Sequence, residues 1–257
     1  MKILPDDKYK NKLIELWIKV FGDERDYIEL LFPENKCICD VFAVAYGETL
    51  CSALYLLDCT LNYKGSAYKG KYLYAAATDP QFRGKGLMAS LITEAEQYCK
   101  ASGIDFISLV PADEGLYGYY NKFGFVEAMH RRCITVPKDI SCENAVEIKA
   151  DEYFSLRDDR LKGFINFSSV SVAYASDCLR YSGSEFYKCG DFLFIKEKGS
   201  KLYDEVLFDG FAATLTVDSS VGSEINETEK YGMLYPLNPE LKRDWKITDI
   251  YMNIALD

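Results

Sequence analysis

A glycine-rich segment that carries two cations is the stretch of the sequence best suited to bind an anion. It reads Gln81-Phe82-Arg83-Gly84-Lys85-Gly86-Leu87-Met88 and lies between an apolar, strand-like run (72–78) and a strongly periodic helical pattern. Glycines let the backbone approach a ligand closely, and the first N–H groups of a helix lack intrahelical partners and favour negative charge. The segment therefore predicts a pyrophosphate-binding turn.

Two well-known phosphate-binding motifs fit this segment poorly. A P-loop needs four residues between its first glycine and a Gly-Lys-Ser/Thr, and both that spacing and the hydroxyl are missing. Gly84-x-Gly86-x-x-Ala89 does match a short dinucleotide fingerprint, but that turn normally follows its strand directly. Here five residues separate Thr78 from Gly84, and several elements precede the turn. The spacing argues against a dinucleotide site.

A second motif lies further along the chain. It reads Tyr120-Asn121-Lys122-Phe123-Gly124-Phe125, an aromatic helix that runs into Gly-Phe. Together with Gln81-x-x-Gly84-x-Gly86 at a strand-to-helix turn, it resembles the two signatures of the GNAT acetyltransferase superfamily, in the same order and at a suitable separation. The resemblance covers residues 1 to about 137. It implies an acyltransferase that takes an acetyl group from acetyl-CoA and passes it to a primary amine.

The resemblance also assigns residues to the cosubstrate. It implies a sheet that opens where the strand at 76–78 parts from the strand at 108–110, so that the pantetheine arm pairs with the free strand edge. The pyrophosphate would lie on the N–H groups that follow. The cofactor-binding residues implied are Ala76, Ala77, Thr78, Gln81, Arg83, Gly84, Lys85, Gly86, Leu87 and Met88.

The same resemblance places a general acid at Tyr120. A phenol is protonated at neutral pH and can give its proton to the thiolate that leaves. The general base stays open between Asp113, Glu114 and the C-terminal residue Asp257. A non-catalytic acyl-CoA sensor or scaffold, which keeps the turn but has lost turnover, is the alternative function.

The periodicity of the first half predicts an α/β fold with a mixed sheet. A helix that begins at Gly86 should cross over between two parallel strands, 67–78 and 104–110. The remaining elements expected are helices over 6–21, 23–32 and 113–123 and strands over 37–46, 50–63 and 125–136.

Residues 137–142 form the expected boundary between a GNAT domain (1–138) and an acidic second domain (139–257). The second half resembles, in outline, the degenerate GNAT-like domain of bacterial proteins of the enhanced-intracellular-survival type, but it has no Gln-x-x-Gly-x-Gly. It is expected to contain helices over 151–161 and 169–181, and strands over 185–189, 191–197, 201–208, 231–237 and 247–256. The segment 216–230 has no clear pattern.

Charge separates the two halves. Nine of the ten net negative charges fall in residues 139–257. This disfavours a nucleic-acid partner and favours a cationic small molecule or peptide amine, for which the acidic, aromatic-rich second half would wall the acceptor site. No apolar run is long enough for a membrane span and no signal peptide is evident, so we expect a cytoplasmic protein, possibly a homo-oligomer.

Cysteine and histidine usage argues against a metal site. The chain has nine cysteines, no Cys-x-x-Cys pair and one histidine, which does not supply a zinc-type ligand set. The cysteines are expected to be reduced and to act as small apolar residues.

Overall fold

A computed structural model describes residues 2–3, 7–139, 144–161, 164–167, 169–208 and 211–243. In the first half the elements are, in chain order, β1 (Lys2–Ile3), α1 (Asp7–Phe21), α2 (Arg25–Glu29), β2 (Asp40–Tyr46), β3 (Thr49–Tyr63), β4 (Ser66–Thr78), α3 (Leu87–Ala101), β5 (Phe106–Leu109), α4 (Glu114–Asn121) and β6 (Val126–Val136). Short 3-10 turns occupy Pro33–Asn35 and Pro80–Phe82. The helices and strands expected for this half are all present.

The second half adds β7 (Val146–Glu147), α5 (Ala150–Arg160), β8 (Phe164–Phe167), α6 (Ser169–Tyr181), β9 (Ser184–Cys189), β10 (Phe192–Glu197), β11 (Leu202–Phe208), β12 (Phe211–Val217), β13 (Ile225–Pro236) and α7 (Pro239–Arg243). The segment that had no clear pattern contains the end of β12 and the start of β13. The strand expected over 247–256 lies outside the described residues.

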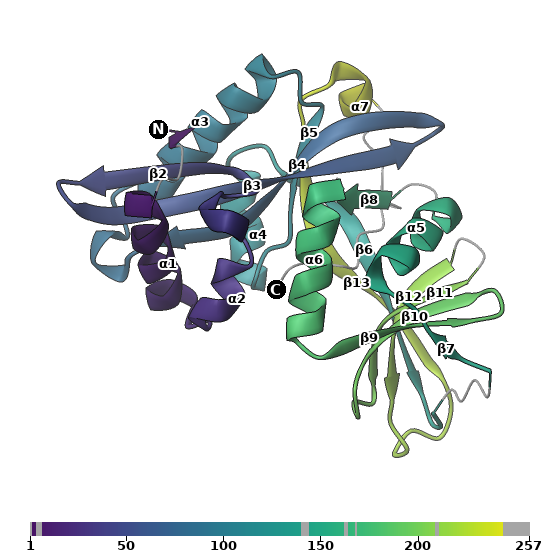
Figure 1. Ribbon diagram of the computed structural model, residues 1–257. Helices are drawn as coiled ribbons and strands as arrows, with labels where there is room; N and C mark the ends of the chain where they lie inside the picture. The colour runs from purple at the N-terminus through teal and green to yellow at the C-terminus, as the bar shows by residue number, and fades with distance from the viewer. Residues whose placement is uncertain are drawn as a thin grey trace.

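The strands of the described chain form one mixed sheet in the order β1-β2-β3-β4-β5-β13-β6-β12-β11-β10-β9-β7, with β8 on the side of β3 (Figure 1). The expected hairpin is present, since β2 and β3 pair antiparallel. The fold is therefore α/β with a mixed sheet, as predicted. Among the helices that the structure describes, none combines the length and apolarity needed to cross a membrane.

The crossover helix α3 joins two parallel neighbours, as the sequence predicted. β4 and β5 pair with each other from Gly70↔Phe106 to Tyr72↔Ser108, where this pairing ends. Gly70 is needed there, because a Cβ would lie 2.1 Å from Cζ of the Phe106 ring. Beyond Tyr72, β4 continues to pair with β3 on its other side, but its pairing with β5 has ended. The sheet therefore opens between β4 and β5.

The last strand that the structure describes, β13, returns to the first half. β13 lies between β5 and β6 and pairs antiparallel with both, through Met233↔Leu109 on one side and Leu234↔Val126 on the other. On its far side β6 pairs parallel with β12. The sheet thus runs without a break across the expected boundary at residue 138, and the division into two domains stays a prediction.

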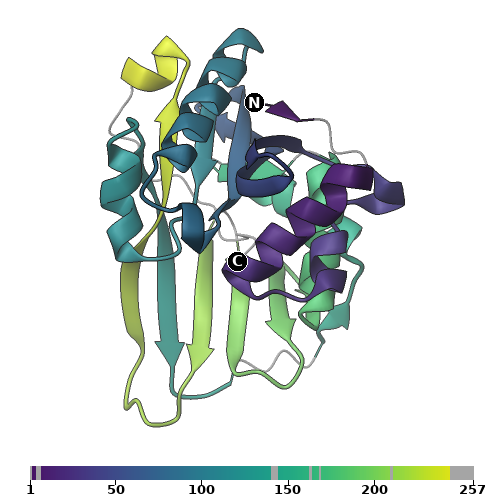
Figure 2. The same cartoon turned by 90° about the vertical axis from the view of Figure 1, so that its left-hand side faces the viewer.

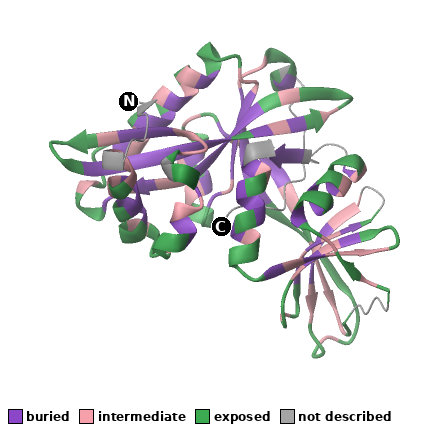
Figure 3. Ribbon diagram, viewed as in Figure 1, coloured by how far each residue is buried: buried purple, intermediate pink, exposed green. Residues whose placement is uncertain are grey.

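Helices cover both faces of the first-half sheet. Figure 2 shows α3 and α4 on the side opposite to α1 and α2. Leu91, Ile92 and Phe125 belong to the apolar core under α3 and α4. The core under α1 and α2 continues without interruption into the second half, where it includes Tyr153 and Phe186, and the buried residues in Figure 3 follow both layers.

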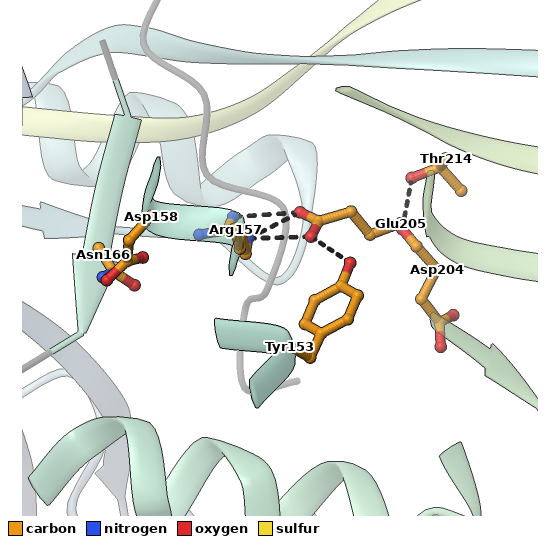
Figure 4. A network of polar contacts seen from close by, with 7 residues as sticks. All are labelled: Tyr153, Arg157, Asp158, Asn166, Asp204, Glu205 and Thr214. Atoms are coloured by element: carbon orange, nitrogen blue, oxygen red, sulfur yellow. Dashed lines mark hydrogen bonds and ion pairs between the residues drawn. The ribbon is translucent and has the colours of Figure 1, made fainter. Parts of the chain in front are cut away.

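A buried ion pair fixes α5 on the second-half sheet (Figure 4). Nε of Arg157 donates to Oε1 of Glu205 at 2.9 Å, and Nη2 donates to Oε2 at 3.1 Å. The Tyr153 hydroxyl donates to the same carboxylate at 2.7 Å. The two charged side chains are 2% and 0% exposed, so this hydrogen bonding is what compensates their removal from water.

Candidate active site

A cleft of about 540 Å³ opens where β4 and β5 part. Its walls come from the ends of these two strands, the start of α4, the end of α1 and one part of β6 and β13. The lining includes Tyr72, Leu73, Tyr74, Ala75, Ala76, Leu109, Val110, Pro111, Asp113, Glu114 and Tyr120. The opening that the resemblance implied is thus the site of a cleft, and it contains Tyr120.

A bulge turns the end of β4 toward this cleft. Ala53 pairs with Ala77 and Tyr55 with Tyr74, so two residues of β4 stand opposite Leu54 alone. Ala75 in the bulge adopts a positive φ of 46°, which costs a non-glycine residue about 1–3 kcal/mol. The bulge breaks the strand alternation, because consecutive residues Tyr74 and Ala75 both pack against the core under α1, whereas Ala76 packs against the core under α3 and α4. Both alanines border the cleft.

The glycine turn follows the end of β4 and has the local geometry that the sequence predicted. Gly84 and Gly86 adopt φ of 75° and 74°, a conformation that disfavours any side chain. Gly86 caps α3 without a side-chain hydrogen bond, and the first backbone bond of this helix runs from Ser90 N–H to Gly86 O at 3.0 Å. The helix therefore begins with unpaired N–H groups.

Asp79 anchors the turn to α1. Its carboxylate accepts from Lys19 Nζ at 2.7 Å and from the Gln81 N–H at 3.0 Å, and it is almost fully buried. The Lys19 ammonium, followed by the Gln81 N–H, lowers the pKa of Asp79. The two cations of the turn are also held locally: Nε of Arg83 donates to Thr78 O at 3.2 Å, and Lys85 Nζ lies 4.7 Å from the centre of the Phe82 ring.

The residues implied for acyl-CoA binding fall into two places. Ala76 is in the cleft wall, and Ala77 and Thr78 continue the same strand, with Ser52 Oγ donating to Ala77 O at 3.0 Å. Gln81, Arg83, Gly84, Lys85, Gly86, Leu87 and Met88 follow on the turn and the first turn of α3. In the described chain the lining of the cleft stops short of this turn. Their assignment to the cofactor stays a prediction.

Tyr120 is one of the buried tyrosines that line the cleft. It lies on α4, is 7% exposed, and packs edge-on against Phe125 and Tyr119. Burial, with a smaller contribution from Tyr119, raises the pKa of Tyr120 to about 12. Within the described residues its hydroxyl makes no hydrogen bond to the protein. The side chain is thus a protonated donor with no other partner there.

The candidate general bases differ in the partners that their carboxylates already have. Asp113 caps α4, because its Oδ1 accepts from the Leu116 N–H at 3.2 Å. Glu114 is largely exposed and lies 3.7 Å from Lys230 Nζ. Both line the cleft. Asp257 lies outside the described residues.

The sequence did not single out the wall that α1 contributes. Trp17, Phe21 and Asp23 line the cleft beside Tyr74. Trp17 is 2% exposed and its indole N–H donates to Asp23 Oδ2 at 2.7 Å, while its ring lies 5.3 Å from that of Tyr74. A tryptophan near the end of an amphipathic helix, followed by Gly22-Asp23, was the available signal.

The second half contributes fewer residues to the cleft wall than its acidic, aromatic-rich composition suggested. Of its described residues, Lys230 and Tyr231 of β13 line the cleft, beside Arg131 of β6. The expectation that its aromatic residues wall the acceptor site is wrong for most of them, because Tyr153, Phe154 and Phe186 pack against each other in the core. No group of three or more potential metal ligands occurs in the part of the chain that is described.

Comparison with known structures identifies the fold. A probable N-acyltransferase of unknown function from Enterococcus faecalis is 13% identical, with a TM-score of 0.70 over 92% of this chain and 72% of its own. Eis1 from Mycobacterium abscessus is 9% identical, with a TM-score of 0.68 over 93% and 74%. A putative acetyltransferase from Pyrococcus horikoshii is 12% identical, with a TM-score of 0.59 over 92% and 88%. At these identities the likeness establishes the fold.

The family match agrees with the fold. Residues 4–128 match the family model described as an acetyltransferase (GNAT) domain. No curated protein matches the sequence. Residues 4–128 are thus similar to a GNAT acetyltransferase domain, and the structural neighbours cover most of the whole chain.

Proposed function

We propose that this protein is an N-acetyltransferase that moves an acetyl group from acetyl-CoA to a primary amine by direct attack. The observation that supports this most is the coincidence of three features in one cleft. The sheet opens between β4 and β5, a bulge turns β4 into the opening, and a buried, protonated phenol without a hydrogen-bond partner in the described chain faces it.

Acetyl-CoA would occupy both the opening and the turn. The pantetheine amides pair with the free edge of β4 at Ala76–Thr78, as an added strand would. The pyrophosphate lies on the N–H groups between Arg83 and Met88, where the positive φ of Gly84 and Gly86 lets the backbone fold around an anion. Lys19 and Asp79 hold this turn against α1.

The chemistry assigned to this cleft is a single transfer. A neutral amine attacks the thioester carbonyl, and the tetrahedral species expels the thiolate of CoA. Tyr120 donates its phenolic proton to that thiolate, which its raised pKa permits throughout the neutral range. Asp113 and Glu114 are the described carboxylates from which the amine could lose its proton, directly or through water.

In this proposal residues 1–138 bind acyl-CoA, and residues 139–257 complete the acceptor side through Lys230 and Tyr231. The acidity of that half attracts a cationic acceptor. The proposal includes a cytoplasmic location.

The test is to incubate the protein with acetyl-CoA and a panel of primary amines and to follow CoA and acetylated amine by mass spectrometry. Mass spectrometry is preferred to a colorimetric thiol reagent, because the partly exposed free thiols of Cys37, Cys39 and Cys133 would add to the signal of such a reagent. Amine-dependent formation of CoA and product in equal amounts supports the proposal. Binding of acetyl-CoA without any transfer to an amine contradicts it and supports a sensor or scaffold.

A further inference from the structure

Two cysteine thiols lie in contact in the segment between α2 and β2. Sγ of Cys37 and Sγ of Cys39 are 3.3 Å apart, and both residues are partly exposed free cysteines. A disulfide bond is about 2.0 Å long, so the two sulfurs need to approach by only roughly 1.3 Å to form one. Neither cysteine is among the described residues that line the cleft, so the pair is separate from the candidate active site.

The backbone on both sides of the pair holds the thiols together. In a straight strand the Cα atoms of residues i and i+2 are about 6.6–6.8 Å apart, at the upper limit for a disulfide. Here the chain bends at Ile38 and Cys39, which shortens this distance, before β2 begins at Asp40. The Ile38 N–H donates to Leu31 O at 3.2 Å, and the Asp40 carboxylate accepts from Lys71 Nζ at 2.8 Å. The segment is therefore anchored before and after the bend.

The two thiols differ in their surroundings. Burial, followed by the contact with Cys37, raises the pKa of Cys39. Cys39 is therefore a protonated thiol at neutral pH and a poor nucleophile toward a molecule in solution. Cys37 follows Lys36, an exposed cation that attracts anionic disulfides. Cys37 is thus the thiol expected to react first, and Cys39 lies beside it to react second.

We propose that Cys37 and Cys39 are a redox-active dithiol, which a small disulfide such as oxidised glutathione converts into an intramolecular disulfide. The Cys37 thiolate attacks one sulfur of the small disulfide, R–S–S–R, and expels RS⁻. Cys39 then loses its proton and attacks the Cys37 sulfur of this mixed disulfide, which forms the Cys37–Cys39 bond and expels a second RS⁻. The two cysteines are oxidised, and the small disulfide is reduced to two thiols. This inference is independent of the proposed acyl transfer.

The bond formed in this way is expected to be reversible. It closes a ring with one residue, Ile38, between the two cysteines. So short a ring strains the disulfide, and strained disulfides are more easily reduced than the structural disulfides of secreted proteins. The pair is therefore a site of reversible modification, and excess thiol restores it.

The test treats the full chain with oxidised glutathione at neutral pH and maps the oxidised cysteines by mass spectrometry. Free thiols are alkylated in denaturant, disulfides are then reduced, and the released thiols are alkylated with a second reagent. Trypsin cleaves after Lys36 and Lys64, so one peptide, residues 37–64, carries the pair together with Cys51 and Cys59. Cys51 and Cys59 are buried and serve as internal controls.

In the wild type the second label is expected on Cys37 and Cys39 in equal amounts. It should exceed the label on Cys51 or Cys59 by at least about tenfold, because exchange requires access to the sulfur. Before reduction, no glutathione is expected to remain on this peptide. Cys39→Ser removes the thiol that displaces the first adduct, so this variant is expected to keep one glutathione on Cys37. Excess reduced glutathione is expected to restore both thiols of the wild type.

Cys133→Ser is the matched control, because Cys133 is another partly exposed free cysteine, on β6. Its pair is expected to be oxidised as in the wild type. Three results would overturn the proposal. They are a wild type whose Cys37 and Cys39 stay reduced, a wild type that keeps glutathione on Cys37, and a Cys133→Ser variant whose pair is no longer oxidised.

Discussion

Replacing Tyr120 with phenylalanine removes the proposed proton donor and little else. The ring keeps its edge-on contacts with Phe125 and Tyr119, at centre distances of 5.7 and 5.3 Å. The hydroxyl forms no hydrogen bond within the described residues, so its loss leaves no buried partner unpaired. We expect the free energy of unfolding to change by less than about 1 kcal/mol.

The expected effect on turnover is much larger. A positioned general acid contributes about 100- to 10 000-fold, which corresponds to roughly 3–5 kcal/mol of activation free energy. The proton is transferred as the thiolate leaves, not when the thioester binds. The variant is therefore expected to lower kcat by that factor and to leave the KM for acetyl-CoA within about twofold.

The pH dependence follows from the raised pKa of Tyr120. The protonated phenol is the active form, and it is lost only as pH rises through about 12. The ratio of wild-type to Tyr120→Phe rates is therefore expected to stay constant from neutral pH to well above it. A ratio that collapses between pH 7 and 9 would mean that the phenol ionises earlier than its burial implies.

The assay is steady-state formation of acetylated amine at saturating acetyl-CoA. Tyr119→Phe is the control, because Tyr119 is the neighbouring residue of the same helix and lies outside the lining of the cleft. Its kcat is expected to be unchanged. Undiminished turnover by Tyr120→Phe, with acetyl-CoA affinity intact, would refute the assignment of Tyr120 as the acid.

Three further predictions concern the cosubstrate, the core and the acceptor. Gly86→Ala is expected to weaken CoA binding at least tenfold in a calorimetric titration, whereas Gly103→Ala, at a similar positive φ at the other end of α3, costs a comparable 1 kcal/mol or so of stability but no affinity. Arg157→Met leaves the Glu205 carboxylate buried without the Arg157 guanidinium, although the Tyr153 hydroxyl still donates to it, so urea denaturation is expected to show a loss of about 3–5 kcal/mol; a loss below about 1 kcal/mol would contradict the structure. Rising ionic strength is expected to raise the KM for a cationic amine acceptor, because salt screens the acidic second half, and a salt-independent KM would speak against charge recognition.

Local patterns in the sequence predicted most elements of the fold. Apolar residues with helical spacing, with Gly22 and Gly103 as stops, placed α1 and α3, and the glycine turn after β4 was recognisable because its conformation depends on consecutive residues. The position of β13 was not predictable in this way. Its first six residues are exposed and, apart from Ile225, polar, and its place between β5 and β6 depends on pairing with strands that lie about a hundred residues away.

The residues of the candidate site also differ in whether a local sequence pattern could reveal them. Tyr120 and Ala76, which line the cleft, belong to contiguous motifs that are recognisable in the sequence, and the assignment of residues 77–88 to the cofactor stays a prediction. Trp17, Asp23 and Tyr231 were missed, since they come from two segments, the end of α1 and β13, that meet only in the folded chain. The aromatic residues of the second half were misassigned because composition does not distinguish a ligand wall from a core, and Tyr153 and Phe186 belong to the core.

The most direct test of the account uses acetyl-CoA with an isotopically labelled acetyl group, the wild-type protein and a mixture of mono- and diamines. The account predicts that the label appears on an amine as CoA is released in equal amount, that Tyr120→Phe lowers this transfer by at least about a hundredfold, and that Tyr119→Phe does not. Labelled acetyl-CoA that binds to the wild type but never passes its acetyl group to an amine would contradict it.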